Sequence, residues 1–113
     1  MINLNRVLIS GFLGSDPETK KAGNSTVTRF SIAVNDRWTD NEGERQERTH
    51  WIPVVAWNSR GENAAKFIHK GSHVLVEGSL SVSSWDDKES GDKRSKTEVV
   101  ASQIIFLDRK SES

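Results

Sequence analysis

The chain has no cysteine, no tyrosine and only two prolines among its 113 residues. Without cysteine, neither disulfides nor zinc sites with thiolate ligands can form. No apolar run approaches the length of a membrane span, and the N-terminus lacks the apolar region of a secretion signal. We therefore expect one soluble, cytoplasmic domain with no membrane contact, long enough to bury a modest core of its own.

An excess of either charge is also lacking, because Lys plus Arg and Asp plus Glu both total 16. A simple nucleic-acid-binding domain often carries a basic excess, so composition alone does not favour one. The charges are unevenly distributed, however. Residues 1–30 and 58–71 are basic, whereas acidic residues gather in 36–47 and 86–92, which we expect to be loops. A basic stripe on a neutral protein is one interpretation, and a solvated surface of mixed charge is the other.

Four tryptophans account for half of the aromatic residues, the rest being four phenylalanines. They are Trp38, Trp51, Trp57 and Trp85, and each has polar or charged neighbours in the chain. A tryptophan of the core usually lies within an apolar run, whereas one beside polar residues can offer a flat face to a ligand. Nucleobases are flat and stack on such rings. Packing in the core or against another subunit is the alternative for each tryptophan.

Alternating apolar residues predict five strands, over residues 4–13, 26–38, 48–57, 73–85 and 96–107. Residues 15–18 predict a turn, and residues 19–25, which contain Gly23 and Asn24, predict the tip of a loop or a hairpin. Gly78 predicts a bulge or a bend within its strand. Pro53 predicts an edge, a bulge or a local break, because proline donates no backbone hydrogen bond.

Between the third and fourth strands the apolar period lengthens to about 3.6 residues and predicts one short helix. Ser59 and Glu62 have the spacing of a capping box at its start. Lys70 is expected in its last turn and Gly71 just past its end. Five strands with this helix between the third and fourth fit an all-β, five-stranded Greek-key barrel of the oligonucleotide-binding (OB) type.

Alternation along the strands predicts which tryptophans face solvent. The expected inward residues are Ile52, Val54 and Ala56 in the third strand, and Val74, Val76, Gly78, Leu80 and Val82 in the fourth. Trp51, Trp57 and Trp85 then point outward. Trp38 alternates in step with the apolar Phe30 and Ile32, so a bulge near Asn35 would be needed to turn it outward.

From about residue 3 to residue 107, the chain resembles the bacterial single-stranded DNA-binding protein family. The matching segments are residues 5–14, 16–18, 31–34, 49–51, 54–55, 70–72, 76–80 and 97–99, together with Trp38 and Trp85. The resemblance implies an OB domain over residues 1–107, followed by a short polar tail over 108–113. It further implies sequence-independent binding of single-stranded DNA in replication, recombination and repair, usually by a homotetramer.

The resemblance places base stacking on Trp38, Trp51, Trp57 and Trp85. The expected phosphate-binding residues are Arg6, Arg29, Arg48, Arg60, Lys70 and Arg94, of which Arg6, Lys70 and Arg94 match basic positions of the family. Residues 81–84 read Ser-Val-Ser-Ser where the family is often basic, so weaker phosphate binding is expected there. Where the family has a polar residue followed by a basic one, this chain has Ile52 and Pro53. We therefore expect one phosphate contact and the subunit contacts to differ from those of the family at these positions.

The outward apolar residues Leu75 and Val55 are expected to need a partner surface, which favours a homo-oligomer. The sequence ends at Ser113 without the acidic tip of the family, so we expect no tail-mediated recruitment of repair enzymes. The alternative function is that of an OB-fold protein–protein adaptor in a primosome-like or mobile-element complex, with weak or no DNA binding.

Neither an enzyme nor a cofactor is expected. His50, His69 and His73 lack the spacing of a zinc site. The adjacent carboxylates Asp86 and Asp87 are better explained by a solvated loop than by a metal site.

Overall fold

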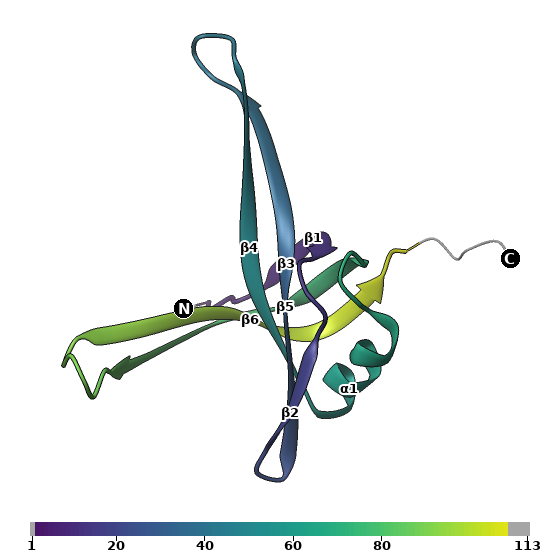
Figure 1. Ribbon diagram of the computed structural model, residues 1–113, viewed down its shortest axis with the longest axis vertical. Coiled ribbons are helices and arrows are strands. Elements are labelled where there is room, and N and C mark those ends of the chain that lie inside the picture. The colour runs from purple at the N-terminus through teal and green to yellow at the C-terminus, as the bar shows by residue number, and fades with distance from the viewer. Residues whose placement is uncertain (1, 109–113) are drawn as a thin grey trace, which may run out of the picture.

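The computed structural model describes residues 2–108, so the tail expected after residue 107 lies, apart from Asp108, outside the described residues. The described part contains strands β1 (Val7–Leu13), β2 (Glu18–Ala22), β3 (Ser25–Thr39), β4 (Arg45–Trp57), β5 (His73–Asp86) and β6 (Lys93–Phe106), and helix α1 (Asn58–Phe67). Figure 1 shows a small barrel from which the β3–β4 and β5–β6 hairpins project in different directions.

The barrel is closed by the strand order β1–β5–β6–β4–β3, with β3 pairing back onto the end of β1. The β4–β6 ladder is parallel and the other pairs are antiparallel. This is the predicted five-stranded Greek-key barrel of the OB type. Strand β2 is an addition at the edge of β3, where Gly23 takes a φ of 66° in a two-residue hairpin turn. The hairpin alternative for residues 19–25 is therefore confirmed.

Aliphatic side chains fill the barrel. The buried cluster consists of Leu13, Phe30, Ile32, Val54, Ala56, Ala64, Ile68, Val74, Val76, Val99 and Ala101. Helix α1 supplies Ala64, packs mainly against β3 and β4, and is followed at once by Ile68. Gly61 permits this approach, since a Cβ there would lie 2.6 Å from the Ala56 carbonyl oxygen and 2.6 Å from Thr28 Oγ1.

The predicted capping box is wrong. Helix α1 begins at Asn58, one residue before Ser59, and its N-cap is Trp57, whose side chain has no acceptor. The Glu62 carboxylate accepts a hydrogen bond from the Thr26 hydroxyl at 3.0 Å, and Asn58 Oδ1 accepts one from the Thr26 amide at 3.0 Å. Both side chains therefore tie the helix to β3 instead of capping it.

The helix also ends earlier than expected, at Phe67, so Lys70 lies in the following loop. Gly71 has the predicted left-handed conformation, with a φ of 93°, but it belongs to this loop. The loop is fixed to the end of β1, because the Gly71 amide donates to the Leu13 carbonyl at 2.9 Å. The Lys70 amide likewise donates to the Asp16 carboxylate at 2.7 Å.

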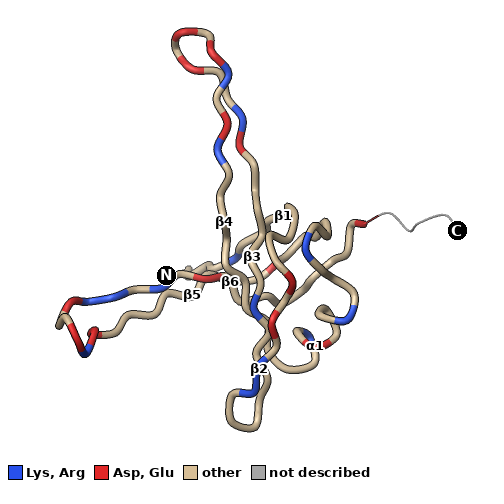
Figure 2. Tube along the Cα trace, viewed as in Figure 1, with Lys and Arg blue, Asp and Glu red and all other residues tan. Residues whose placement is uncertain are grey.

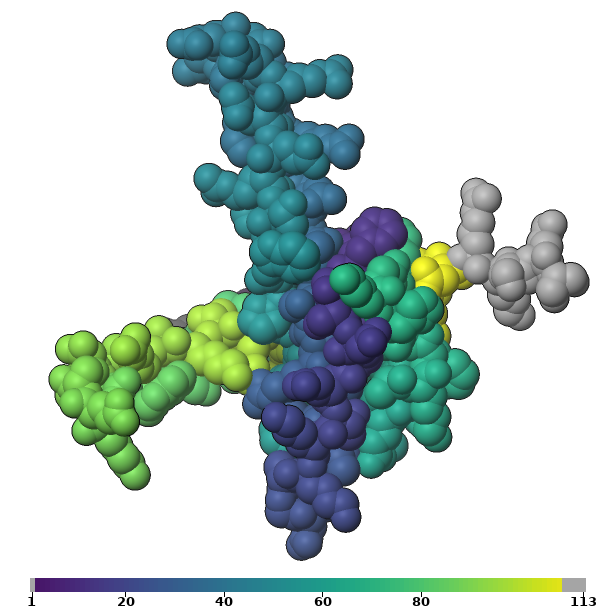
Figure 3. Space-filling model, viewed as in Figure 1, coloured from purple at the N-terminus to yellow at the C-terminus, as the bar shows by residue number. Residues whose placement is uncertain are grey.

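Both long hairpins extend beyond the barrel, as Figure 3 shows. Strands β3 and β4 continue into the acidic segment that was expected to be a loop, and only residues 40–44 turn. Their register runs unbroken from Val27 opposite Trp57 to Thr39 opposite Arg45. The bulge near Asn35 that would be needed to turn Trp38 to the other side is therefore absent from this hairpin.

On the β5–β6 hairpin, a register shift between Glu77 and Gly78 confirms the bulge alternative at Gly78, and the extra residue, Ser102, lies on the partner strand β6. The expected core positions Leu80 and Val82 are wrong, because both side chains are exposed beyond the end of the barrel. Pro53 pairs only with β3, because the β4–β6 ladder covers just the two residues that follow it. It thus occupies a local edge, one of the predicted alternatives.

Val55 is buried within the monomer, so the expectation that it needs a partner surface is wrong. It lies between Arg29 of β3 and Val100 of β6 in the ladders, at the centre of the sheet. Leu75 is half-buried and faces outward, as expected.

Candidate nucleic-acid interface

Three of the four tryptophans share one continuous outer face of the sheet. Directly opposite residues of paired strands point to the same side, so the register can be followed from strand to strand. Val55 is opposite Arg29 and beside Val100, and on the same side Trp85 is opposite Arg94. We call this surface the tryptophan face, and it carries Trp51, Trp57, Trp85, Arg29, Arg94, Lys96 and Glu98.

The exposed fractions are 62% for Trp51, 41% for Trp57 and 50% for Trp85. The predicted outward orientation of these three side chains is therefore confirmed. Trp51 and Trp57 lie six residues apart on β4, about 20 Å at the rise of an extended strand. Trp85 lies near the far end of the β5–β6 hairpin, opposite Arg94.

The Trp51 ring lies over the backbone of Gly14, just past the end of β1. The three atoms nearest to a Cβ built on Gly14 are all ring carbons of Trp51, with Cε3 at 3.0 Å, Cη2 at 3.3 Å and Cζ3 closer still. The absence of a Cβ at Gly14 therefore leaves the space that the indole ring occupies. The loop that carries Lys70 is hydrogen-bonded to Leu13 and Asp16, the neighbours of this position, so Lys70 lies near the Trp51 platform.

Trp38 lies near the end of the β3–β4 hairpin and is 45% exposed. It points to the side of the ribbon opposite to Trp51, in step with the barrel core, as the alternation predicted. It is exposed because the hairpin extends beyond the barrel core at this residue. The Arg48 guanidinium lies 6.0 Å from the Trp38 ring centre, within the range of a cation–π contact. Arg37, Arg45 and Gln46 line a shallow pocket with Trp38.

The structure brings four of the six expected phosphate-binding residues close to a tryptophan or onto the tryptophan face: Arg29, Arg48, Lys70 and Arg94. Arg6 lies one strand further round the barrel, where its Nε donates to Glu77 at 2.7 Å. Arg60 lies on α1, which covers one end of the barrel. Figure 2 shows the cations along the hairpins and the acidic residues concentrated near their tips.

Lys96 was missed by the sequence reasoning. It alternates with Arg94 and Glu98 along β6, so all three point to the tryptophan face. Its ammonium lies 3.6 Å from Glu98 Oε2, to which the Arg29 guanidinium donates at 2.6 Å. The spacing of two residues from Arg94 was the signal that could have identified it.

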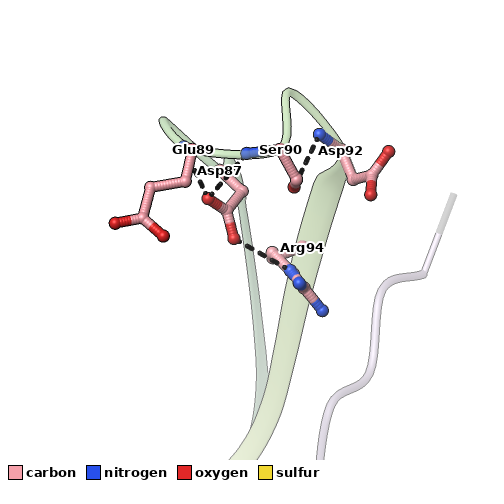
Figure 4. A network of polar contacts seen from close by, with 5 residues as sticks. All are labelled: Asp87, Glu89, Ser90, Asp92 and Arg94. Carbon is pink, nitrogen blue, oxygen red and sulfur yellow. Dashed lines mark hydrogen bonds and ion pairs between the residues drawn. The ribbon is translucent and has the colours of Figure 1, made fainter.

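The tips of the two long hairpins are each fixed by an aspartate that accepts backbone hydrogen bonds. The Glu89 and Ser90 amides donate to Asp87 Oδ1 at 2.8 and 3.4 Å, and Arg94 Nε donates to Oδ2 at 3.2 Å (Figure 4). These bonds, led by that from Glu89, hold the pKa of Asp87 below its usual range. Asp87 is thus a turn residue. Within residues 2–108, no cluster of three or more His, Asp or Glu side chains could hold a metal ion.

Asp40 does the same at the tip of the β3–β4 hairpin. Its Oδ1 accepts from the amides of Glu44 and Glu42, both at 2.9 Å, and its Oδ2 accepts from Gln46 Nε2 at 3.0 Å. The bond from Glu44 is the main cause that lowers the pKa of Asp40.

A closed five-stranded barrel with exposed indoles and cations along one outer face defines the class of OB-fold nucleic-acid-binding proteins. Residues 4–107 match the model of the single-strand binding protein family. The chain therefore belongs to this family. In the part of the chain that the structure describes, no helix is long and apolar enough to cross a membrane.

Two relatives, both named single-stranded DNA-binding protein 1, agree with this assignment. That of Chlorobaculum tepidum is 38% identical over 108 residues, covering 95% of this chain and 67% of that protein. That of Xylella fastidiosa is 38% identical over 116 residues, covering 100% of this chain and 84% of that protein.

Two solved structures are also similar. The Plasmodium falciparum SSB complex with ssDNA has a TM-score of 0.86 at 31% identity, covering 96% of this chain and 98% of that one. A deletion mutant of the single-stranded DNA binding protein from Thermus aquaticus has a TM-score of 0.82 at 26% identity, covering 93% of this chain and 51% of that one.

Proposed function

We propose that this chain binds single-stranded DNA without sequence preference and thereby protects single strands during replication, recombination and repair. The observation that carries the proposal is the exposure of three tryptophans on one outer face that also bears cations. The family and the similarity to a solved complex with single-stranded DNA support it. Stacking is tolerant of sequence because every base has a π face.

We assign base stacking to Trp51, Trp57 and Trp85 on the tryptophan face and to Trp38 on the β3–β4 hairpin. Phosphate contacts fall to the cations beside them, Arg29, Arg48, Lys70, Arg94 and Lys96. Because Trp51 and Trp57 are about 20 Å apart, one base cannot span them, and the strand contacts them in turn. Each base stacked on an aromatic side chain contributes about 1–3 kcal/mol.

Titration with a short oligothymidine tests this function through the intrinsic fluorescence of the tryptophans. We expect strong quenching, and an affinity whose logarithm falls with log salt by about 0.7 for each phosphate neutralised. A duplex of the same length serves as the control. Equal binding to the duplex would contradict the proposal, and unchanged fluorescence without binding would favour the adaptor function.

We further propose that the chain forms a homo-oligomer, with a tetramer as the expected state. An apolar patch on the outer side of the β1–β5–β6 sheet supports this proposal: Leu8, Phe12 and Ile105 are exposed, and Leu75 is half-buried beside Ile105. Exposed apolar patches of this kind mark contact surfaces. Light scattering with and without oligothymidine measures the assembly. A monomeric mass at micromolar concentration would refute it.

A further inference from the structure

The tryptophan face carries a carboxylate, that of Glu98, at its centre, and this side chain is mostly buried. Glu98 is 14% exposed at its side chain, the lowest value for any ion-paired carboxylate within residues 2–108. Two cations approach the same oxygen, Oε2: the Arg29 guanidinium at 2.6 Å and the Lys96 ammonium at 3.6 Å.

The ion pair spans the sheet between the aromatic platforms. Arg29 lies on β3 and Glu98 on β6, with β4 between them, so the contact crosses the strand that carries Trp51 and Trp57. Glu98 is opposite Ser81 of β5, on the strand that leads to Trp85. A DNA strand that runs from Trp57 on β4 to Trp85 on β5 crosses β6 close to this carboxylate. A shallow pocket, lined in part by Arg29, Pro53, Lys96 and Glu98, opens at this point.

The charges at this point offset one another. Arg29 and Lys96 would present two positive charges to the phosphates, and Glu98 reduces their sum to one. Both cations remain about half-exposed, at 46% and 45% of their side chains, so a phosphate can reach them. A guanidinium that already donates to a carboxylate has fewer donors free for a phosphate.

We propose that Glu98 limits the affinity of the DNA site by competing with the phosphates for Arg29 and Lys96. This inference rests on the proposed function and adds a residue that sets the strength and salt dependence of binding. Relatively weak, electrostatic binding lets a protein slide and hop along a nucleic-acid strand. The carboxylate achieves this without removing a tryptophan or a cation.

The test compares Glu98→Gln with the native chain and with Glu62→Gln. The control makes the same change in net charge on α1, where glutamine can still accept the hydrogen bond from Thr26. For Glu98→Gln we expect binding of oligothymidine about two- to fivefold tighter at low salt, the scale of an exposed ion pair. The salt slope should steepen by about 0.7 for each additional phosphate that the variant neutralises.

The outcomes separate this inference from the function itself. If the native chain binds no oligothymidine, the proposed function fails. If the native chain binds but Glu98→Gln binds no tighter than Glu62→Gln, the inference fails and the function stands. Weaker binding by Glu98→Gln would show that the carboxylate positions Arg29 for the phosphate, which also overturns the inference. Circular dichroism checks folding, and Glu98→Thr removes the same charge if the glutamine variant is unfolded.

Discussion

Replacing Gly14 with alanine should displace the Trp51 ring from its stacking position, although the tryptophan itself is unchanged. A Cβ at this position would lie 3.0 Å from Trp51 Cε3 and 3.3 Å from Cη2. Carbon atoms pack at about 3.5–4.0 Å, and Cζ3 would lie closer to the new Cβ than either of these atoms, so the ring has to move outward by about 1 Å or more, or swing aside. The ring is 62% exposed, which gives it room to do so. We therefore expect Gly14→Ala to fold normally.

Binding should respond more than folding does. Removal of one stacking ring by Trp51→Ala should weaken binding by about 1–3 kcal/mol, and a displaced ring should forfeit part of this. We expect Gly14→Ala to lose about 1 kcal/mol, roughly a fivefold rise in Kd. The assay is titration with oligothymidine at fixed salt, with thermal unfolding followed by circular dichroism.

The double variant Gly14→Ala/Trp51→Ala provides the decisive comparison. All three nearest atoms to the new methyl group belong to the Trp51 ring, so alanine at residue 14 should have no further effect once the ring is absent. The two substitutions should therefore be strongly non-additive. Additive losses would refute the reasoning, because alanine would then act on something other than the ring. Unfolding of Trp51→Ala would show that this ring belongs to the core.

Three further results are expected. Gly78→Ala should destabilise the fold by about 1–3 kcal/mol in urea unfolding, because its Cβ would strike the Val100 carbonyl across the bulge; a native midpoint would contradict this. Lys70→Ala should reduce the salt slope of DNA binding by about 0.7, and an unchanged slope would remove Lys70 from the phosphate path. The depressed pKa values of Asp40 and Asp87 mean that these carboxylates stabilise the turns above the ordinary value of 3.8 and lose this effect as the pH falls through the lower folded values. The NMR shifts of the tip amides should therefore change with a midpoint below pH 3.8; a midpoint at or above that value would oppose this.

Local rules predicted the parts of the fold that local physics decides. The bulge at Gly78 follows from a glycine within a strand, and the outward orientation of Trp85 follows from alternation with the apolar residues before it. The capping box failed for a different reason. Ser59 and Glu62 have the right spacing, but the Glu62 carboxylate accepts a hydrogen bond from Thr26, 36 residues away in the sequence, instead of capping the helix. Tertiary contacts thus overrode a local signal.

Alternation predicts which side a residue faces, but only the barrel decides whether that side is covered. Trp38, Leu80 and Val82 all follow the alternation of the core, and all three are exposed because their hairpins continue past the barrel. Val55 shows the converse, since its outward side is the crowded centre of the sheet. The length of the hairpins, which the sequence pattern does not reveal, therefore turns an apparent core position at Trp38 into an accessible ring.

The charge of the tryptophan face depends on the least predictable pairing in the barrel. The parallel ladder that joins β4 to β6 pairs only Val54 with Val99 and Val55 with Val100. A slip of one residue would turn Arg94, Lys96 and Glu98 to the inner side, since side chains alternate along a strand. It would also separate Glu98 from Arg29, 69 residues away in the sequence. A chain with no net charge can thus present cations beside its tryptophans because the β5–β6 and β4–β6 ladders together set the register of β6, and composition alone could not have indicated it.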